Sequence, residues 1–441
     1  MSEALPAVAL PLPGRGMQGW LERAPSSVFA LYAGLMCFGT YFAMYAFRKP
    51  FSVASFAHVP GFGGVDYKIA LVIAQVVGYA LAKLNGVKVV SELPASRRII
   101  GILIQIGVAE AALVGFALIP APWNVACLFL DGLALGMVWG MVFGFVEGRR
   151  QSELIGAMLC ASFILSSGVV KSVGAAVMLH GGVNQFWMPA ATGLIFAPLL
   201  FLCLAGLAVL PPPNPGDVAA RIKRAPMDGA ARARLLWRIG PGLIALIAIY
   251  IMLTALRDFR DNFAADIWVE QGLGGDADIF AWTELPVGIV VLAALASLAL
   301  IRDNGRAMIA NFALVGLGLV IAGLSSLAFL LHWIGAIGWM VALGGGLYLA
   351  YTPFNGLLFD RLVAVNGEVG NAGFLIYVAD ASGYAGSVAL LMVKNFGGLH
   401  LAWTRFLIDA GIATCVIGLA LLAVTAVFFR RHFVTVPVIQ R

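Results

Sequence analysis

The chain has 441 residues, of which 61% are hydrophobic and only 11% are charged, and its net charge is +6. Because a soluble domain carries roughly 25% charged residues, this composition excludes an ordinary soluble protein and predicts a polytopic membrane protein. The cations are scattered among apolar segments, which argues against nucleic-acid binding and favours loop charges on a membrane protein. The first residues lack a basic stretch before a short apolar one, so we expect no cleaved signal peptide.

Twelve apolar segments recur along the chain, and each is long enough to cross a bilayer as a helix, which takes about 20 residues. This pattern predicts an all-α membrane protein with twelve transmembrane helices. The predicted segments span residues 26–57, 67–90, 99–119, 122–147, 153–179, 186–210, 240–268, 278–301, 306–330, 332–359, 369–395 and 402–429.

A proline-rich, basic stretch separates the first six segments from the last six. It divides the chain into an N-terminal segment (1–25), a first six-helix bundle (26–210), a linker (211–239), a second six-helix bundle (240–430) and a tail (431–441). Lys and Arg are concentrated in the terminal segments, in the linker and in the loops on the same side of the predicted membrane. Because positive charge marks the cytoplasmic side, we expect a multi-pass protein of the cell (inner) membrane with both termini and the linker in the cytoplasm.

The two bundles are related by an internal repeat. Tyr41 precedes Arg48 by seven positions in the first segment, and Tyr250 precedes Arg257 by seven positions in the seventh, at an offset of 209 residues. Matches between the fourth and tenth segments and between the fifth and eleventh have offsets of 212 and 215 residues, so the alignment drifts by only three residues per comparison. Two pseudo-symmetric six-helix halves joined by a linker are typical of the major facilitator superfamily.

Two arginines occupy repeat-related positions inside the predicted membrane. A charge at the centre of a bilayer costs about 2.5–3.5 kcal/mol on insertion scales, so it must face a cavity or a partner. Arg48 and Arg257 would meet near the axis that relates the halves, and arginine suits bidentate capture of phosphate or carboxylate. We therefore expect this arginine pair to bind an anionic solute at the midplane. The alternative is a structural role in which Asp131 or Asp258 neutralises them.

Other polar residues of the apolar segments complete the candidate site. Tyr79 and Lys83 are four residues apart, and hence on one face of the second helix. Lys83 is either a third anion ligand or a residue whose long stem extends toward the cytoplasmic end. Tyr41 joins them in the expected substrate-binding set. The remaining ionisable residues are candidates for charge pairing or coupling, and they are Asp380, Glu284, Asp131, Lys171, Arg260 and Asp261.

The seventh segment holds a cluster of charges with its own internal geometry. Arg257 and Asp261 are four positions apart, which favours an ion pair within the helix. Asp258 and Arg260 are two apart and do not face each other. In the first segment Lys49 is the immediate neighbour of Arg48, so we expect it to point away from that arginine and to serve the scaffold.

Short motifs in both bundles resemble those of a known family. They are "MYAFRKPF" with Arg48 and Lys49, "YALAKL" with Tyr79 and Lys83, the set Leu256, Arg257, Phe263 and Glu270, the pair Trp282 and Glu284, Ala372–Phe374, and "GYAGSV" at 383–388. The chain is similar in these motifs to the organophosphate:phosphate antiporters of the major facilitator superfamily, which include glycerol-3-phosphate and hexose-phosphate transporters. The resemblance implies that Arg48 and Arg257 bind phosphate and that transport is an exchange for inorganic phosphate.

One pair of positions departs from that family. Leu165 stands where its best-known members have a histidine, and Asp380 is the repeat mate of position 165. An aspartate near two arginines is either a protonation switch for proton-coupled symport or an ion-pair partner for Lys171 or Arg257. Because an unpaired carboxylate repels phosphate, a less anionic or zwitterionic solute is an open alternative.

These features favour a secondary transporter of a small organic anion, organophosphate-like, that works by alternating access in the lipid bilayer. The alternatives are a proton-coupled symporter of a carboxylated or zwitterionic solute and a transporter-like membrane sensor of such a ligand. Phosphate or protons are the candidate coupling ions. The sequence shows no Walker A motif, metal-ligand cluster or nucleophile motif, so we expect neither an enzyme nor a cofactor. We also expect no nucleic-acid partner and a monomeric protein.

Overall fold

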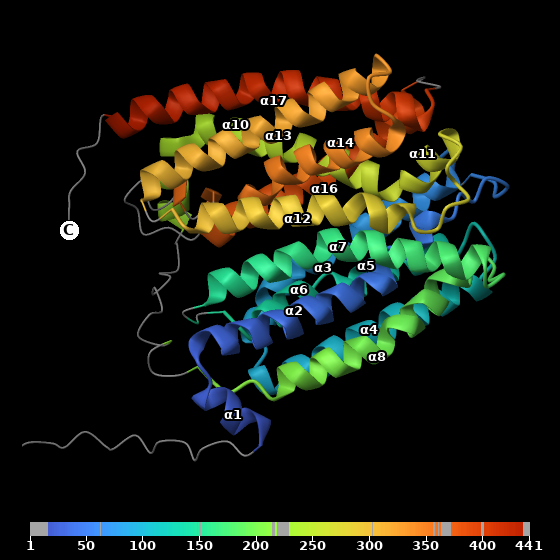
Figure 1. Ribbon diagram of the computed structural model, residues 1–441, viewed down its shortest axis with the longest axis horizontal. Coiled ribbons are helices and arrows are strands. Elements are labelled where there is room, and N and C mark those ends of the chain that lie inside the picture. The colour runs from blue at the N-terminus through green and yellow to red at the C-terminus, as the bar shows by residue number, and fades with distance from the viewer. Residues whose placement is uncertain are drawn as a thin grey trace, which may run out of the picture.

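The computed structural model of the protein describes residues 16–61, 63–147, 149, 151–213, 217, 229–301, 303–355, 358–359, 361–362, 372–397 and 401–434. Most of these residues lie in long helices that run side by side (Figure 1). Parts of all five predicted regions lie outside the described residues: 1–15 of the N-terminal segment, 214–216 and 218–228 of the linker, 435–441 of the tail, and short stretches of both bundles, of which 363–371 is the longest.

Six helical spans form the first half, which occupies the lower part of Figure 1 and follows the short helix α1 (Met17–Arg23). One of the six is broken into two helices, and the short 3-10 helix η1 (Pro50–Val53) follows the first span. The spans are α2 (Ser26–Arg48), α3 (Tyr67–Glu92), α4 (Ala95–Leu118), α5 (Val125–Leu135) with α6 (Val138–Phe143), α7 (Ser152–Leu179) and α8 (Met188–Ala208).

Six further spans form the second half, in the upper part of Figure 1. The first of them continues into a short helix, and the 3-10 helix η2 (Thr352–Asn355) follows the fourth. The spans are α10 (Gly229–Asn262) with α11 (Ala264–Glu270), α12 (Ile279–Ala299), α13 (Asn304–Leu330), α14 (Ala336–Tyr351), α16 (Ala372–Phe396) and α17 (Trp403–Val434).

The outer surface of these helices is apolar, as contact with lipid requires. Within the described ranges, ten helices are long and apolar enough to cross a membrane, and α14 and α16 complete the twelve predicted crossings. Ile104, Leu194, Ile244 and Ile309 are each at least 60% exposed, and such broad apolar exposure marks a membrane-facing surface. The prediction of an all-α membrane protein with twelve transmembrane helices is confirmed.

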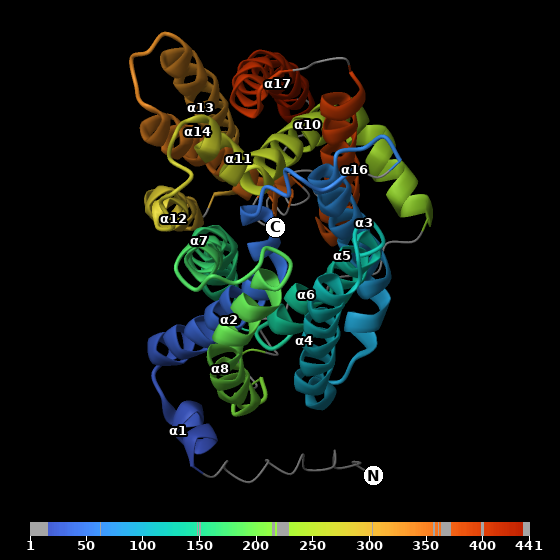
Figure 2. The same cartoon turned by 90° about the vertical axis from the view of Figure 1, so that its right-hand side faces the viewer.

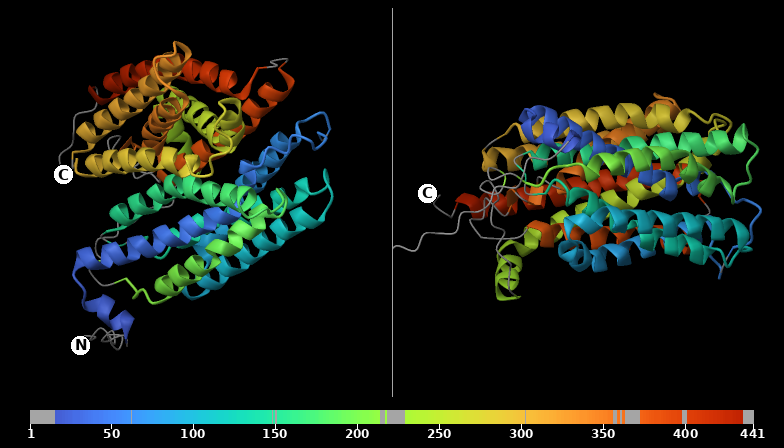
Figure 3. Two further views of the ribbon diagram at one scale, coloured as in Figure 1. Left: turned by 45° about the vertical axis from the view of Figure 1, so that its right-hand side comes forward. Right: turned by 90° about the horizontal axis from the view of Figure 1, so that it is seen from below.

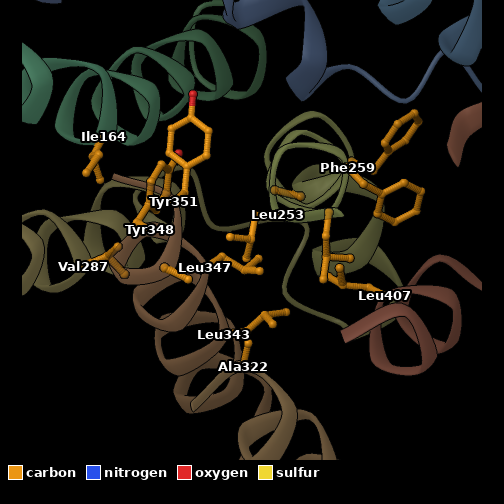
Figure 4. Packing of buried hydrophobic residues seen from close by; sticks show 14 of the residues in the cluster. Ile164, Leu253, Phe259, Val287, Ala322, Leu343, Leu347, Tyr348, Tyr351 and Leu407 are labelled. Atoms are coloured by element: carbon orange, nitrogen blue, oxygen red, sulfur yellow. The ribbon is translucent and has the colours of Figure 1, made fainter. Parts of the chain in front are cut away.

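The two halves meet along two pairs of helices. Helix α7 packs against α12, and α3 packs against α16, and Figure 2 shows both pairs at the boundary between the halves. At one end of the bundle α11 contacts η1, so we call this the α11 end. Figure 3 shows the halves from two further sides. Inside the second half, Leu253 and Phe259 of α10, Leu343 and Leu347 of α14 and their neighbours fill the core (Figure 4).

Several helix ends differ from the predicted segment bounds, and proline explains two of them. The first segment was expected to be apolar helix to residue 57, but α2 ends at Arg48 and η1 begins at Pro50, because proline lacks the N–H that would continue the helix. In the tenth segment α14 ends at Tyr351 and η2 follows with Pro353 at its second position. Each half therefore has a 3-10 turn at a helix end.

Three other helices differ from the predicted segments. The fourth segment is interrupted at Gly136 and Met137, which separate α5 from α6. Helix α10 begins at Gly229, so the end of the predicted linker is helical. Helix α17 extends to Val434, past the predicted end of the second bundle. Polar or basic residues at the ends of these helices continue the helix beyond the apolar stretch, and an apolar count does not detect them.

Glycines bring α3 and α5 into close contact. A Cβ atom at Gly78 would meet the backbone of Phe129, and one at Gly132 would meet the backbone of Gln75. Small residues let helix backbones approach closely inside a membrane. This contact fixes α5 against α3 at the level of Gln75.

Candidate solute-binding site

Arg48, the last residue of α2, is held by aromatic rings. Its guanidinium carbon lies 3.9 Å from the ring centroid of Tyr79 and 5.7 Å from that of Tyr45. The Nε atom is buried without a hydrogen-bond partner among the described residues. No described carboxylate lies within 4.0 Å, the ion-pair distance, of this guanidinium. Arg48 is thus a cation that rests on ring faces, an arrangement that is worth about 0.5–2 kcal/mol.

Arg257 lies in a matching aromatic position on α10, but an acid neutralises it. Its guanidinium carbon lies 3.9 Å from the ring centroid of Tyr351. Its terminal nitrogen donates to Asp258 Oδ1 at 2.7 Å, and Ser387 donates to the other oxygen of Asp258 at 2.8 Å. The expected intrahelical pair with Asp261 is wrong, and the alternative partner Asp258 is the one observed. The reason is that Asp261 is bound to lysines from the other half.

Tyrosines from both halves surround the two arginines. The hydroxyl groups of Tyr41 and Tyr79 are hydrogen-bonded at 3.3 Å, and those of Tyr250 and Tyr351 are hydrogen-bonded at 3.1 Å. The repeat-related Tyr41 and Tyr250 therefore make the same kind of bond. Tyr384 of α16 meets Tyr79 edge to face, with centroids 5.8 Å apart. The sequence analysis missed the contributions of Tyr351 and Tyr384, although Tyr384 lies inside the "GYAGSV" motif.

Lys83 forms an ion pair that crosses between the halves. Its ammonium group lies 2.7 Å from Asp380 Oδ2 on α16. It also lies 5.5 Å from the ring centroid of Tyr79 and 5.4 Å from that of Tyr384. Tyr250 donates to the other oxygen of Asp380. Tyr79 and Lys83 share one helix face, as the four-residue spacing predicts, and the ammonium group is bonded rather than extended along the helix.

The expected ion-pair partners of Asp380 need correction. Neither Lys171 nor Arg257 is the ion-pair partner of Asp380 in the described part, because both have a nearer acid. Leu165 of α7 lies at the contact with α12, where a Cβ atom at Gly288 would meet its side chain. A spacing along the chain does not report which neighbouring helix an acid faces.

Asp261 is the centre of a buried cluster between the halves. Lys49 and Lys171 of the first half each place Nζ 2.5 Å from one of its carboxylate oxygens, and Ser167 donates to it at 2.6 Å. Lys49 also donates to Asn262 at 3.0 Å. Lys49 thus belongs to this cluster and not to the aromatic site of its neighbour, which agrees with the expected scaffold role. The cluster holds two cations and one anion.

Arg260 forms a separate ion pair inside the second half. Its NH1 atom donates to Glu284 Oε1 at 2.6 Å and its NH2 atom donates to the carbonyl of Met340 at 2.8 Å. The Arg260 side chain is 1% exposed. Trp282, two residues before Glu284, is 71% exposed on the outer surface of α12. This pair connects α10, α12 and α14 within the second half.

Asp131 does not neutralise Arg48 by an ion pair, contrary to one alternative from the sequence. Its Oδ2 atom accepts a hydrogen bond from Gln75 Nε2 at 2.7 Å. Its Oδ1 atom is buried and has no hydrogen-bond partner within the described residues. Gln75, which the sequence analysis missed, stands between Asp131 and the main chain of Arg48.

Two further contacts at the α11 end were also missed. Lys68 of α3 lies 2.5 Å from Asp266 of α11 and so joins the halves. Glu270, at the end of α11, accepts from the backbone N–H groups of Trp403 and Thr404, at 2.8 Å each. It thereby satisfies two free donors at the start of α17. The motif residue Glu270 therefore acts as a helix cap in this chain.

Comparison with solved structures identifies the class of fold. The peptide transporter POT, solved in complex with sulfate, matches with a TM-score of 0.59 and 16% identity over 95% of this chain and 97% of that chain. The nucleoside transporter NupG matches with a TM-score of 0.62 and 12% identity over 90% and 98%. A bacterial homologue of the human lysosomal transporter Spinster matches with 0.59 and 12% over 92% and 98%. The protein therefore has the fold of major facilitator transporters, as the repeat predicted.

Comparison with sequence families gives a more specific result. Residues 50–432 match the family described as a family of unknown function, DUF5690. This match covers most of the chain, and the protein belongs to that family. A comparison with curated proteins gives no match.

Proposed function

We propose that the protein is a secondary active transporter that moves a small organic anion across the bilayer by alternating access of its two halves. The observation that carries this proposal is Arg48, which has no described carboxylate within ion-pair distance and rests on Tyr79 at 3.9 Å. Arg48 is half-buried, its Nε atom is buried, and a cation without a counter-charge is costly inside a membrane. An anionic solute supplies the missing charge, and departure of that solute restores the cost.

The balance of charges favours a particular class of solute. Asp258 neutralises Arg257, and Asp380 neutralises Lys83, so Arg48 leaves one positive charge at the aromatic site. A solute with one net negative charge fits this balance, for example a monocarboxylate or the monoanion of a phosphate ester. A phosphate dianion, which the resemblance to organophosphate:phosphate antiporters implies, would need a second cation, and Lys83 provides one when it leaves Asp380.

The neighbouring residues have distinct roles in this proposal. Arg48 and Arg257 bind the anion from the two halves, and Tyr41 and Tyr79 support Arg48 and contact the organic part of the solute. Arginine is suited to this task because its planar guanidinium binds carboxylate and phosphate in a bidentate manner. Exchange for inorganic phosphate is one coupling mode, and symport with protons is the other.

The topology follows the distribution of positive charge. We place both termini and the linker (211–239) in the cytoplasm and the protein in the cell (inner) membrane, with one bundle before and one after the linker. The solute is the expected partner besides lipid, and no enzymatic step is proposed. A membrane sensor with the same site is the competing function, and it differs by binding the ligand without moving it.

A thermal-shift screen of the purified full-length protein tests the site. The probes are inorganic phosphate, glycerol 3-phosphate, a hexose phosphate, a set of monocarboxylates and a set of amino acids. We expect at least one anion to raise the melting temperature of the wild type, and this shift to be lost in Arg48→Ala and Arg257→Ala. Arg405→Ala is the matched control, because Arg405 is half exposed on α17 and pairs with Asp409.

Two outcomes contradict the proposal. A ligand that stabilises Arg48→Ala as strongly as the wild type and Arg405→Ala shows that the anion binds elsewhere. If the identified anion binds but does not accumulate in proteoliposomes that contain the wild-type protein, the protein is a sensor.

A further inference from the structure

A buried acid in the first half has no ionic partner among the described residues. Asp131 lies on α5 and is 0% exposed. One of its oxygens accepts from Gln75 at 2.7 Å, while the other is buried without a hydrogen-bond partner among the described residues. A fully buried carboxylate with a single neutral donor is poorly stabilised, and burial of this kind favours the neutral, protonated form.

The helices that pack against α5 bring few compensating charges to Asp131. They are α3, α4 and α2, and the groups that act on Asp131 are Gln75 from α3, Glu110 from α4 and Arg48 from the end of α2. Glu110 is a second acid, and both of its carboxylate oxygens are buried without a described partner. The membrane lysines of α3 are bonded to acids of the second half. Arg48 is therefore the nearby cation, and it is not within ion-pair distance.

Gln75 connects Asp131 directly to the arginine site. Its amide nitrogen donates to Asp131 at 2.7 Å and to the main-chain carbonyl of Arg48 at 2.8 Å. That carbonyl lies at the end of α2, where Pro50 stops the helix and leaves carbonyl groups without helical donors. The backbone contact between Gly132 and Gln75 holds the two side chains at this distance. A change of charge on Asp131 thus acts on the segment that positions Arg48.

We propose that Asp131 is a proton-binding site of the transporter and that Gln75 couples its charge state to the end of α2 at Arg48. The coupling part rests on the proposed transport function, whereas the proton site does not. Loss of the proton breaks the carboxyl O–H bond, leaves a carboxylate on Asp131 and transfers the proton to water on one side of the membrane. A proton fits this site better than a metal ion, because Gln75 directs an N–H donor at one carboxylate oxygen, while the other oxygen is buried without a described partner and can carry a proton.

The proton site is tested by measuring stability against pH, without any ligand. The full-length protein in detergent is melted at values from about pH 5 to about pH 9. A group that holds its proton more tightly in the folded state stabilises the fold at low pH, and this stability is lost as the pH rises. We expect the melting temperature of the wild type to fall with rising pH, and Asp131→Asn, which mimics the protonated acid, to be flatter.

Matched variants make this measurement decisive. Asp409→Asn removes an exposed acid on α17 and is expected to keep the wild-type profile. Glu110→Gln measures how much of the pH dependence comes from Glu110, the other buried acid without a described partner. If Asp131→Asn unfolds, Asp131→Glu keeps an ionisable group at the same place and is expected to shift the midpoint of the profile. A profile of Asp131→Asn that overlays the wild type, or an Asp131→Glu midpoint equal to that of the wild type, overturns the proton site.

Coupling is tested in proteoliposomes with an imposed pH gradient, and the probe is the anion found in the thermal-shift screen. We expect the gradient to accelerate uptake by the wild type but not by Asp131→Asn, and Gln75→Leu to weaken this response. Uptake by Asp131→Asn that responds to the gradient as the wild type does refutes the coupling role. If the wild type takes up no anion, the transport proposal fails, and the stability profile still decides whether Asp131 binds a proton.

Discussion

Lys83 Nζ lies 2.7 Å from Asp380 Oδ2, and this pair joins α3 of the first half to α16 of the second. The two side chains are 25% and 13% exposed, so water screens them only in part. Tyr250 also donates to Asp380, which connects the pair to the repeat-related tyrosines. The pair lies beside the aromatic site of Arg48, because Lys83 is also near the ring of Tyr79, and it stabilises the observed contact of α3 with α16.

Removal of either partner of this pair is expected to destabilise the observed conformation. Lys83→Met and Asp380→Asn each leave a partly buried group unpaired, and the double variant leaves none. We therefore expect a coupling energy of about 0.5–3 kcal/mol in a double-mutant cycle of apparent stability. Additive effects of the two substitutions would show that the ion pair does not form.

The net positive charge of the Asp261 cluster predicts which of its residues is more costly to replace. Two lysines and one aspartate are buried together, so Asp261→Asn leaves two buried cations unpaired, whereas Lys171→Met leaves one neutral pair. We expect Asp261→Asn to cost about 3–5 kcal/mol of apparent stability and Lys171→Met to cost clearly less. Thermal denaturation in detergent ranks the two, and the reverse order would exclude the observed arrangement.

Two substitutions at Tyr79 separate the contribution of its ring to anion binding from that of its hydroxyl group. Its ring face lies under Arg48 and its hydroxyl bonds Tyr41. We expect Tyr79→Phe to bind the anion of the thermal-shift screen nearly as well as the wild type. Tyr79→Leu should weaken binding by roughly 2- to 30-fold, the equivalent of about 0.5–2 kcal/mol of cation–π energy. Equal losses in both variants would mean that the hydroxyl group matters rather than the ring.

The close contact between α3 and α5 predicts that alanine is destabilising at Gly132 but not at Gly107, which lies outside the contact. Gly132→Ala forces a Cβ atom against the backbone of Gln75, so we expect a loss of about 1–3 kcal/mol of apparent stability. Gly107→Ala on α4 is the matched control, because a Cβ atom there has no atom within 4 Å. It should be neutral or stabilising by up to about 1 kcal/mol, since alanine favours the helix. Equal destabilisation would contradict the close approach of α3 and α5.

The sequence predicts the number of helices and the two halves well, because both depend on long apolar segments and on the spacing of residues such as Tyr41 and Arg48. It predicts helix ends less well. The end of α2 at Arg48 follows from Pro50, which is a signal in the sequence for the end of a helix. The break between α5 and α6 at Gly136 has no comparable local signal. Glycine is common in membrane helices that continue without a break.

Charge pairing between helices was the least predictable part. Lys83 and Asp380 are 297 positions apart in the sequence, and their contact depends on how α3 and α16 face each other across the halves. Local spacing instead suggested an ion pair between Arg257 and Asp261 within one helix. That pair is absent from the described helix because Lys49 and Lys171 reach Asp261 from the first half. A lone sequence contains no information on such distant neighbours.

The buried cluster of Lys49, Lys171 and Asp261 carries one net positive charge inside the membrane, and Arg48 adds a second. Charges that move with the halves feel the transmembrane voltage, which is worth about 2.3 kcal/mol per elementary charge per 100 mV. In the proposed transport cycle, a bound anion cancels the charge of Arg48 in the loaded state of the protein but not in the empty state. In that cycle, the membrane potential is expected to act more strongly on the return of the empty protein than on the step that moves the solute.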